Sequence, residues 1–184
     1  MWAWIIVGGV LLLLVLFLVV TYNRLVRLRN RVEESWAQID VQLKRRHDLI
    51  PNLVETVRGY AAHERQTFEE VTKARAAAVA AQGVGEQAKA EAGLSQALLN
   101  LRAVAEAYPQ LQANTNFLAL QEELAGTEDK ISSSRQFYNA AVRTYDTARE
   151  VFPTNLVAGM FNFEEKEYFE TEDPESREPT AVRF

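Results

Sequence analysis

Residues 36–58, WAQIDVQLKRRHDLIPNLVETVR, form the stretch around which the rest of the chain is organised. Their apolar side chains recur at spacings of three, four and seven, which places them on one stripe of a helix. Pro51 interrupts this pattern, because a proline removes one helical hydrogen bond and presses on the carbonyl four residues earlier, here that of His47. Two interpretations stay open. Either one helix kinks at Pro51, or Asp48 caps a new helix with Pro51 in its first turn.

The N-terminal residues 2–20, WAWIIVGGVLLLLVLFLVV, contain no charge. As a helix with about 1.5 Å per residue they would extend about 28 Å, close to the ~30 Å hydrocarbon core of a bilayer. Trp2, Trp4 and Tyr22 stand where aromatic residues anchor a span. A cleaved signal peptide would need a basic start, a shorter apolar core and a small-residue cleavage site, and all three are missing. We therefore predict an uncleaved transmembrane anchor over residues 1–23.

Arginines at positions 24, 27, 29 and 31 follow the predicted span, and no lysine or arginine precedes it. By the positive-inside rule, the short N-terminus lies outside the cell membrane and the rest of the chain lies in the cytoplasm. The same arginines could bind anionic lipid headgroups at about 1 kcal/mol each. The alternative is that they serve only as a topology signal.

The plainest helical pattern runs from Phe117 to Phe152. Six large residues recur there at unbroken spacings of seven: Phe117, Leu124, Ile131, Tyr138, Tyr145 and Phe152. The companion row from Leu120 to Ala148 is small or polar. Such a 3–4 repeat predicts packing in a helical bundle with a slight left-handed supercoil. Asn114-Thr115 is the predicted start of this helix, and Pro153 ends it.

Boundary signals at Gly59, residues 82–85 and Tyr108-Pro109 separate the remaining helices. If the first helix continues through Pro51, two long helices enclose a short hairpin, and this balance of lengths favours the kink over the break. We predict an all-α fold with a transmembrane helix followed by an antiparallel four-helix bundle. The predicted parts are an anchor (1–23), the bundle (24–153), a segment that packs back on the bundle or on a partner (154–170), and a disordered acidic tail (171–184).

Charged residues gather near the middle of the predicted bundle. With the first and fourth helices antiparallel and Phe152 level with Arg24, basic residues of one helix face acidic residues of the other. The members of this central polar ring are Arg45, Arg46, Asp48, Glu128, Asp129 and Arg135. Charges inside a bundle usually fix its register. A ligand site is the alternative.

The short hairpin reaches only the half of the long helix pair that lies away from the membrane. The near half would expose an apolar strip with Trp36, Tyr138, Tyr145 and Phe152. Monomeric proteins seldom leave such a strip open to water. We therefore predict an interaction surface here, covered by residues 156–169, by a second copy of the chain or by a partner.

The last residues provide a second candidate interaction site. Val182 and Phe184 alternate, so an extended strand would point both side chains to one face, next to the terminal carboxylate. Backbone amides and a pocket can capture such an end. The alternative is a chain end without a role.

No pattern in the sequence predicts a reaction. The chain has no cysteine, and its two histidines, His47 and His63, lie sixteen residues apart without further metal-ligating spacing. Residues 83–85, GVG, lack the glycine or lysine of a phosphate-binding loop. The formal net charge of −5 disfavours nucleic acid. We expect no catalytic residue, cofactor, metal or nucleic-acid partner.

Three stretches carry a family resemblance. These are residues 36–64, WAQIDVQLKRRHDLIPNLVETVRGYAAHE; residues 124–153, LAGTEDKISSSRQFYNAAVRTYDTAREVFP; and residues 161–170, FNFEEKEYFE. Together they resemble the LemA family of bacterial, membrane-anchored helical proteins, with Glu128, Arg135, Tyr138, Asn139 and Tyr145 at the places of the fourth-helix signature. The chain departs from the family pattern at His47, where tyrosine is frequent, and at Asp129 and Asp146, where asparagine is common. No role is carried over to these three side chains.

The resemblance implies a place in the bacterial inner membrane without an established activity. LemA proteins are linked with membrane proteases of the HtpX type, and a relative serves magnetosome membrane formation. We therefore expect a non-catalytic adaptor or scaffold that self-associates, touches lipid headgroups and engages an HtpX-type protease or another membrane protein, in envelope quality control or membrane organisation. The alternative is a signalling receptor whose bundle senses a ligand, but such a sensor would normally place its domain outside the cell and carry an output module.

Overall fold

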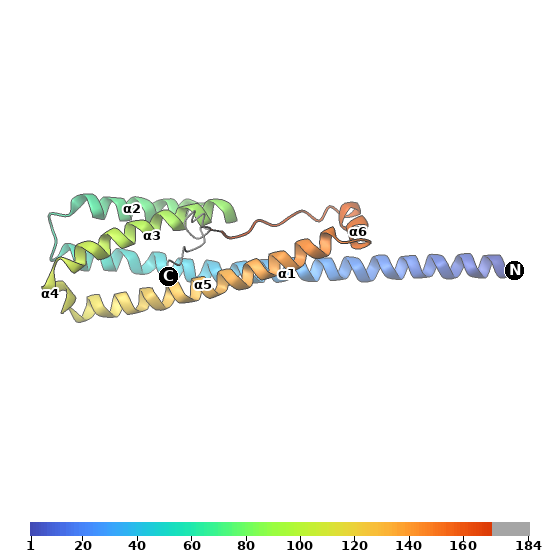
Figure 1. The fold of residues 1–184 in the computed structure, drawn as a ribbon, viewed down its shortest axis with the longest axis horizontal. Helices are drawn as coiled ribbons and strands as arrows, with labels where there is room; N and C mark the ends of the chain where they lie inside the picture. The colour runs from blue at the N-terminus through green and yellow to red at the C-terminus, as the bar shows by residue number, and fades with distance from the viewer. Residues whose placement is uncertain (171–184) are drawn as a thin grey trace, which may run out of the picture. The chain divides into compact units, whose positions relative to one another are not determined.

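The computed structural model describes residues 1–170, within which the regular structure is helical (Figure 1). The helices in these residues are α1 (Trp2–Arg58), α2 (Arg65–Ala80), α3 (Val84–Glu106), α4 (Pro109–Gln112), α5 (Thr115–Glu150) and α6 (Thr154–Met160). The predicted tail 171–184, with Val182 and Phe184, lies outside the described residues. The all-α class and the N-terminal apolar helix are confirmed. The antiparallel four-helix bundle stays a prediction.

The chain divides into two compact units, and α1 and α5 each contribute to both. The anchor unit comprises Met1–Val41 and Ser132–Glu167, and the hairpin unit comprises Gln42–Ile131 with residues 168–170. The predicted anchor (1–23) and the start of the predicted bundle lie on one helix, since α1 runs from Trp2 to Arg58 without interruption, and the division between them stays a prediction.

Pro51 lies inside α1, so the interpretation in which a new helix starts near Asp48 is wrong. The lost hydrogen bond has a substitute. Pro51 has no N–H to offer the carbonyl of His47, and the Arg75 side chain of α2 donates its Nε–H to that carbonyl oxygen at 2.7 Å. A buried carbonyl would otherwise lack a partner, which costs about 1–3 kcal/mol. A contact from another helix therefore supports the passage of α1 through its proline.

The hairpin unit has one hydrophobic core, to which α1, α2, α3, α4 and the start of α5 all contribute. Its largest members are Ile50, Leu53, Val57, Phe68, Leu94, Leu101, Leu111 and Phe117. Alanines on α2 and α3 fill much of the remaining core, which lets these two helices approach closely. Gly83 starts α3 with φ of +83°, a conformation that a residue with a Cβ rarely adopts, so the tight turn after α2 depends on glycine.

In the anchor unit, packing begins at the end of the apolar stretch of α1. Residues 2–17 are exposed along their whole length, Leu18 is partly buried and Thr21 is buried. This helix is long and apolar enough to cross a membrane. Beyond it, buried residues alternate between helices: Leu25, Val32 and Ile39 on α1, Tyr138, Val142 and Tyr145 on α5, and Val157, Ala158 and Phe163 from α6 and the residues after it.

The heptad row of α5 is buried except at its end. Phe117, Ile131, Tyr138 and Tyr145 are buried, and Leu124 is partly buried. Phe152 is 78% exposed, because α5 ends at Glu150, two residues earlier. The helical phase of the row is lost there, so Phe152 does not pack with the other five residues of the row.

Candidate functional site

A cluster of buried polar side chains joins α1 to α3 inside the hairpin unit. Gln87, Glu91 and Ser95 lie four residues apart on α3 and therefore share one face of that helix. Arg46 and His47 are neighbours on α1. Of these, Arg46, His47 and Glu91 are buried, with Arg46 3% and Glu91 4% exposed. Charges removed from water this far require partners.

Glu91 is the hub of the cluster. Its Oε2 accepts a hydrogen bond from Arg46 at 3.1 Å, and its Oε1 lies 2.7 Å from His47 Nε2. Gln87 also donates to Oε1, at 2.8 Å. An ionised carboxylate only accepts hydrogen bonds, so the histidine nitrogen is the donor. The two donors from α1, Arg46 and His47, join it to α3 at this carboxylate, while Gln87 supports the carboxylate from within α3.

Arg46 has two further contacts. One terminal nitrogen donates to Ser95 Oγ at 2.7 Å and lies 3.4 Å from Glu128 on α5. The Nε atom of Arg46 is buried without a hydrogen-bond partner. The guanidinium thus links three helices and retains one unused donor, which is unusual for a buried polar group.

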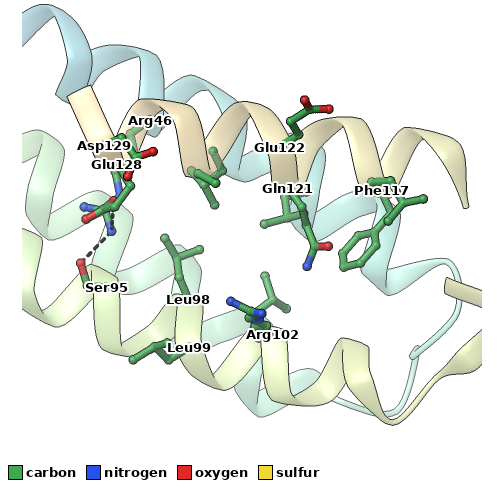
Figure 2. A pocket seen from close by; sticks show the side chains of 15 residues that line it. Arg46, Ser95, Leu98, Leu99, Arg102, Phe117, Gln121, Glu122, Glu128 and Asp129 are labelled. Carbon is green, nitrogen blue, oxygen red and sulfur yellow. Dashed lines mark hydrogen bonds and ion pairs between the residues drawn. The ribbon is translucent and has the colours of Figure 1, made fainter. Parts of the chain in front are cut away.

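An open groove of about 790 Å³ adjoins this cluster (Figure 2). Its floor and walls are mostly apolar and come from α3 and α5 with Leu53 of α1; the apolar members are Leu53, Leu98, Leu99, Leu101, Phe117, Leu118, Leu124 and Ala125. Figure 2 shows Arg46, Ser95, Glu128 and Asp129 grouped at one end, with Phe117 toward the other. Arg102, Gln121 and Glu122 complete the polar lining. Its size and its largely apolar floor match those of ligand- or peptide-binding clefts.

The residues of the predicted polar ring are placed differently from one another. Arg46 and Glu128 form an ion pair, and Asp129 lines the groove. Arg45 pairs instead with Glu123 at 2.6 Å, on the surface. Asp48 is exposed. Arg135 is partly buried and belongs to the anchor unit, whereas the other five belong to the hairpin unit.

The four predicted interaction residues in the half of the helix pair near the membrane differ in their exposure to water. Tyr138 and Tyr145 are buried at 2% and 0% exposure, and Trp36 is partly buried with its ring 5.4 Å from that of Tyr138. The two tyrosines are therefore not open to water. Of the three covers that the sequence leaves open, the structure has the chain's own segment, residues 161–167. Phe152 is the one of the four that is fully accessible.

This covering segment is held by the side chains that it covers. Tyr145 donates its hydroxyl hydrogen to the carbonyl of Glu164 at 2.8 Å, and Tyr138 donates to that of Glu167 at 2.7 Å. Tyr138 and Tyr145 are seven helical residues apart, which is a rise of about 10 Å. Glu164 and Glu167 are three residues apart, and three residues of extended chain also span about 10 Å. The spacing of the two hydroxyls therefore matches the spacing of the two carbonyls that they bind. Asp146 adds a third bond by accepting the Lys166 N–H at 3.4 Å.

Burial changes the acidity of these groups. Desolvation, with the nearby charges of Glu167 and Asp146, raises the pKa of Tyr138 from 10.0 to about 12. Desolvation also raises the pKa of Tyr145. The pKa of Asp146 is raised for the same reason, although the Lys166 N–H and Arg149 oppose the change. Asp146 Oδ2 is buried without a hydrogen-bond partner, which agrees with a carboxylate that is only partly compensated.

Residues 1–170 contain no group of three or more histidines and carboxylates arranged to hold a metal ion. The buried cluster joins an arginine, a histidine and a carboxylate by hydrogen bonds, and Ser95 Oγ is bonded to the arginine.

Glu91 and Ser95 are the members of this site that the sequence did not reveal. Facing residue numbers relate α1 to α5 in the antiparallel alignment, but they do not relate α1 to α3. A signal was present, because glutamate at a position with apolar residues three before and three after it, Ala88 and Leu94, stands on the buried face of α3. A lone charge in an apolar stripe indicates a buried partner.

Comparisons with known proteins agree with the sequence motifs. The model of the LemA family matches residues 35–184. Magnetosome protein MamQ 2 of Paramagnetospirillum magneticum is 27% identical over 179 residues, covering 83% of this chain and 66% of the relative. Magnetosome protein MamQ of Magnetospirillum gryphiswaldense is 27% identical, with 65% of its length covered. Protein LemA of Metamycoplasma hominis is 24% identical over 74% of this chain. The chain spans slightly less than two thirds of the length of these curated relatives.

Proposed function

This chain belongs to the LemA family, and from that premise we propose that it is a non-catalytic adaptor, anchored in the bacterial inner membrane by α1, that binds helices of other membrane proteins. The proposed topology places the N-terminus outside and the helical domain, an antiparallel four-helix bundle, in the cytoplasm. The proposed partners are a second copy of the chain and other membrane proteins, HtpX-type proteases among them. The names of the magnetosome relatives support a role in membrane organisation.

The observation that carries this proposal is the groove beside the buried cluster. Its apolar lining includes Leu99 and Leu118, which remain exposed to water. Two roughly parallel ridges on neighbouring helices suit a third helix, which would insert apolar residues at spacings of three and four. The exposed rim is acidic on balance, with Glu122, Glu128 and Asp129 against Arg102. The partner that fits is therefore an amphipathic helix with basic residues beside its apolar face.

A charge placed in the groove tests this function. We expect Leu99→Glu to abolish co-purification of partners in mild detergent, because the apolar floor would then contain an unpaired carboxylate. Val79→Glu on α2 is a matched control, since Val79 is as exposed as Leu99 and lies outside the groove. Both variants should keep the melting temperature of the parent chain. Equal recovery of partners with both variants would refute the groove as the binding surface.

A ligand receptor is the second candidate, and the unpartnered Nε of Arg46 favours it. An anionic group in the groove could accept that donor together with Ser95. The two functions differ in topology, because a sensor of external ligands would place the hairpin unit outside. Protease treatment of right-side-out membranes should leave the domain intact if it is a cytoplasmic adaptor. Digestion of the domain from outside would favour the receptor.

A further inference from the structure

The chain carries a second apolar surface in the anchor unit, next to the end of the apolar stretch of α1. Residues 151–163, VFPTNLVAGMFNF, contain no charged side chain, although Arg149 and Glu150 precede them and Glu164 and Glu165 follow. They include α6. The exposed apolar residues of this segment are Val151, Phe152, Leu156, Met160 and Phe161.

Both faces of α6 carry apolar side chains and no charge, and Asn155 is the polar residue that the exposed face includes. Val157 and Ala158 are buried against the rest of the anchor unit, while Leu156 and Met160 remain 61% and 66% exposed. A surface helix in water normally carries polar or charged residues opposite its buried stripe. The absence of charge from the exposed face of α6 indicates that this face does not meet bulk water.

Contacts with α1 fix the level of this surface along the span. The ring of Phe161 lies 4.8 Å from that of Tyr22, edge to face, and the ring of Phe163 lies 5.6 Å from it. Figure 1 shows α6 beside α1 at this end of the anchor unit. Tyr22 follows the uncharged residues 2–20 directly, at the position of an interfacial aromatic.

The next two turns of α1 mark the polar side of the same boundary. The guanidinium of Arg29 lies 5.7 Å from the centre of the Phe163 ring. Arg24 and Arg27 are exposed. The apolar surface of residues 151–161 therefore lies between two parts of α1. On one side is the apolar stretch that is long enough to cross a bilayer, and on the other are arginines that can bind anionic headgroups.

We propose that residues 151–161 form an interfacial wedge, which inserts Phe152, Leu156, Met160 and Phe161 into the boundary between headgroups and acyl chains of the membrane that α1 spans. The occupant of this surface is the lipid bilayer. A short apolar helix in this layer reaches about 5–10 Å below the headgroups. The wedge rests on the proposed membrane anchoring, and it adds a second attachment that fixes the rotation of the anchor unit about α1.

Single-cysteine variants test the wedge directly, because the chain has no cysteine of its own. The full-length variant Leu156→Cys carries an environment-sensitive fluorophore in vesicles of phosphatidylcholine and phosphatidylglycerol that are brominated near the headgroup. Val41→Cys on α1 is the aqueous control, since Val41 is 60% exposed and lies well beyond the span. Leu14→Cys, inside the apolar stretch, reports the span itself.

We expect the probe at Leu156 to shift its emission to the blue and to lose intensity in brominated vesicles, as the probe at Leu14 does, whereas the probe at Val41 changes in neither respect. Met160→Cys, on the same face of α6, should behave as Leu156→Cys does. Quenching at Leu14 without quenching at Leu156 and Met160 would overturn the wedge and leave the span intact. A blue shift at Leu156 without bromine quenching would mean that protein covers this face, which also overturns the proposal. Absence of quenching at Leu14 would refute the membrane anchoring on which the wedge rests.

Discussion

Replacing Glu91 with alanine should be the most damaging single change in the polar cluster. It removes the carboxylate shared by Arg46 and His47, at 3.1 and 2.7 Å, and leaves a guanidinium that is only 3% exposed. Breaking a buried ion pair from one side costs about 3–5 kcal/mol. Arg46 keeps Ser95 and the more distant Glu128, so we expect a loss near the lower end, about 3 kcal/mol.

The same calculation gives a small effect for Glu128, the partner that facing residue numbers suggest. The Glu128 side chain is 51% exposed and its oxygen is 3.4 Å from Arg46, so solvent screens the pair. We expect Glu128→Ala to cost less than about 1 kcal/mol. Replacing both Arg46 and Glu91 with methionine and leucine should recover most of the loss, because neither charge then remains buried alone.

Thermal unfolding of the full chain in detergent micelles, followed by circular dichroism, measures these differences. For a chain of this length about 1 kcal/mol moves the melting temperature by roughly 2–4 °C, so Glu91→Ala should lower it by roughly 6–12 °C. A loss for Glu128→Ala that equals or exceeds the loss for Glu91→Ala would show that α5, and not α3, holds Arg46. No change for Glu91→Ala would show that the cluster is solvated.

Three further predictions concern Pro51 and the segment over α5. Arg75→Met should destabilise the parent chain by about 1–3 kcal/mol but a Pro51→Ala chain much less, because alanine restores the N–H that the His47 carbonyl lacks; additive losses in a double-mutant cycle would contradict this. The folded state favours neutral Tyr138, whose pKa is raised from 10.0 to about 12, so the free energy of unfolding that is present below pH 10 should fall by roughly 2 kcal/mol as pH rises to 12, and alkaline unfolding of Tyr138→Phe should lack that loss. The raised pKa of Asp146 means that the folded state holds this proton more tightly than the unfolded state does. The free energy of unfolding should therefore fall as pH rises above about 3.8, and Asp146→Asn should become more stable relative to the parent chain over the same rise in pH. A difference in melting temperature between the two chains that is the same at every pH would refute the shift.

Periodicity was sufficient to predict the long helices, because α1 and α5 present apolar stripes that any packing partner must bury. The contact that supports α1 at Pro51 could not be predicted from the sequence. Arg75 lies on α2, twenty-eight residues after His47, and no local pattern directs its side chain to the His47 carbonyl. Pro153 predicts the end of α5, and the helix ends at Glu150, three residues before that proline. Proline biases the residues before it away from helix, and this local effect prevails over the heptad spacing that reaches Phe152.

The candidate site was only partly accessible to the same reasoning. Arg46 and Glu128 could be related by aligning two antiparallel helices, because their facing positions follow from one register. Glu91 depends on how the hairpin of α2 and α3 docks onto α1, and that docking is set by the shapes of many alanines. Tyr138 and Tyr145 illustrate the converse. Their heptad spacing correctly indicates burial, but the segment that covers them is extended and has no period by which to recognise it.

Site-specific crosslinking from the groove is the most direct test of the proposed adaptor. A photoreactive group at Leu99 in native membranes would report what occupies the groove, with the same group at the equally exposed Val79 as control. We predict crosslinks from Leu99, but not from Val79, to an amphipathic helix of a membrane protein or of a second copy, with its apolar residues at spacings of three and four and basic residues beside them. Crosslinks to lipid or to no protein segment at Leu99, or the same partners at both positions, would contradict the account.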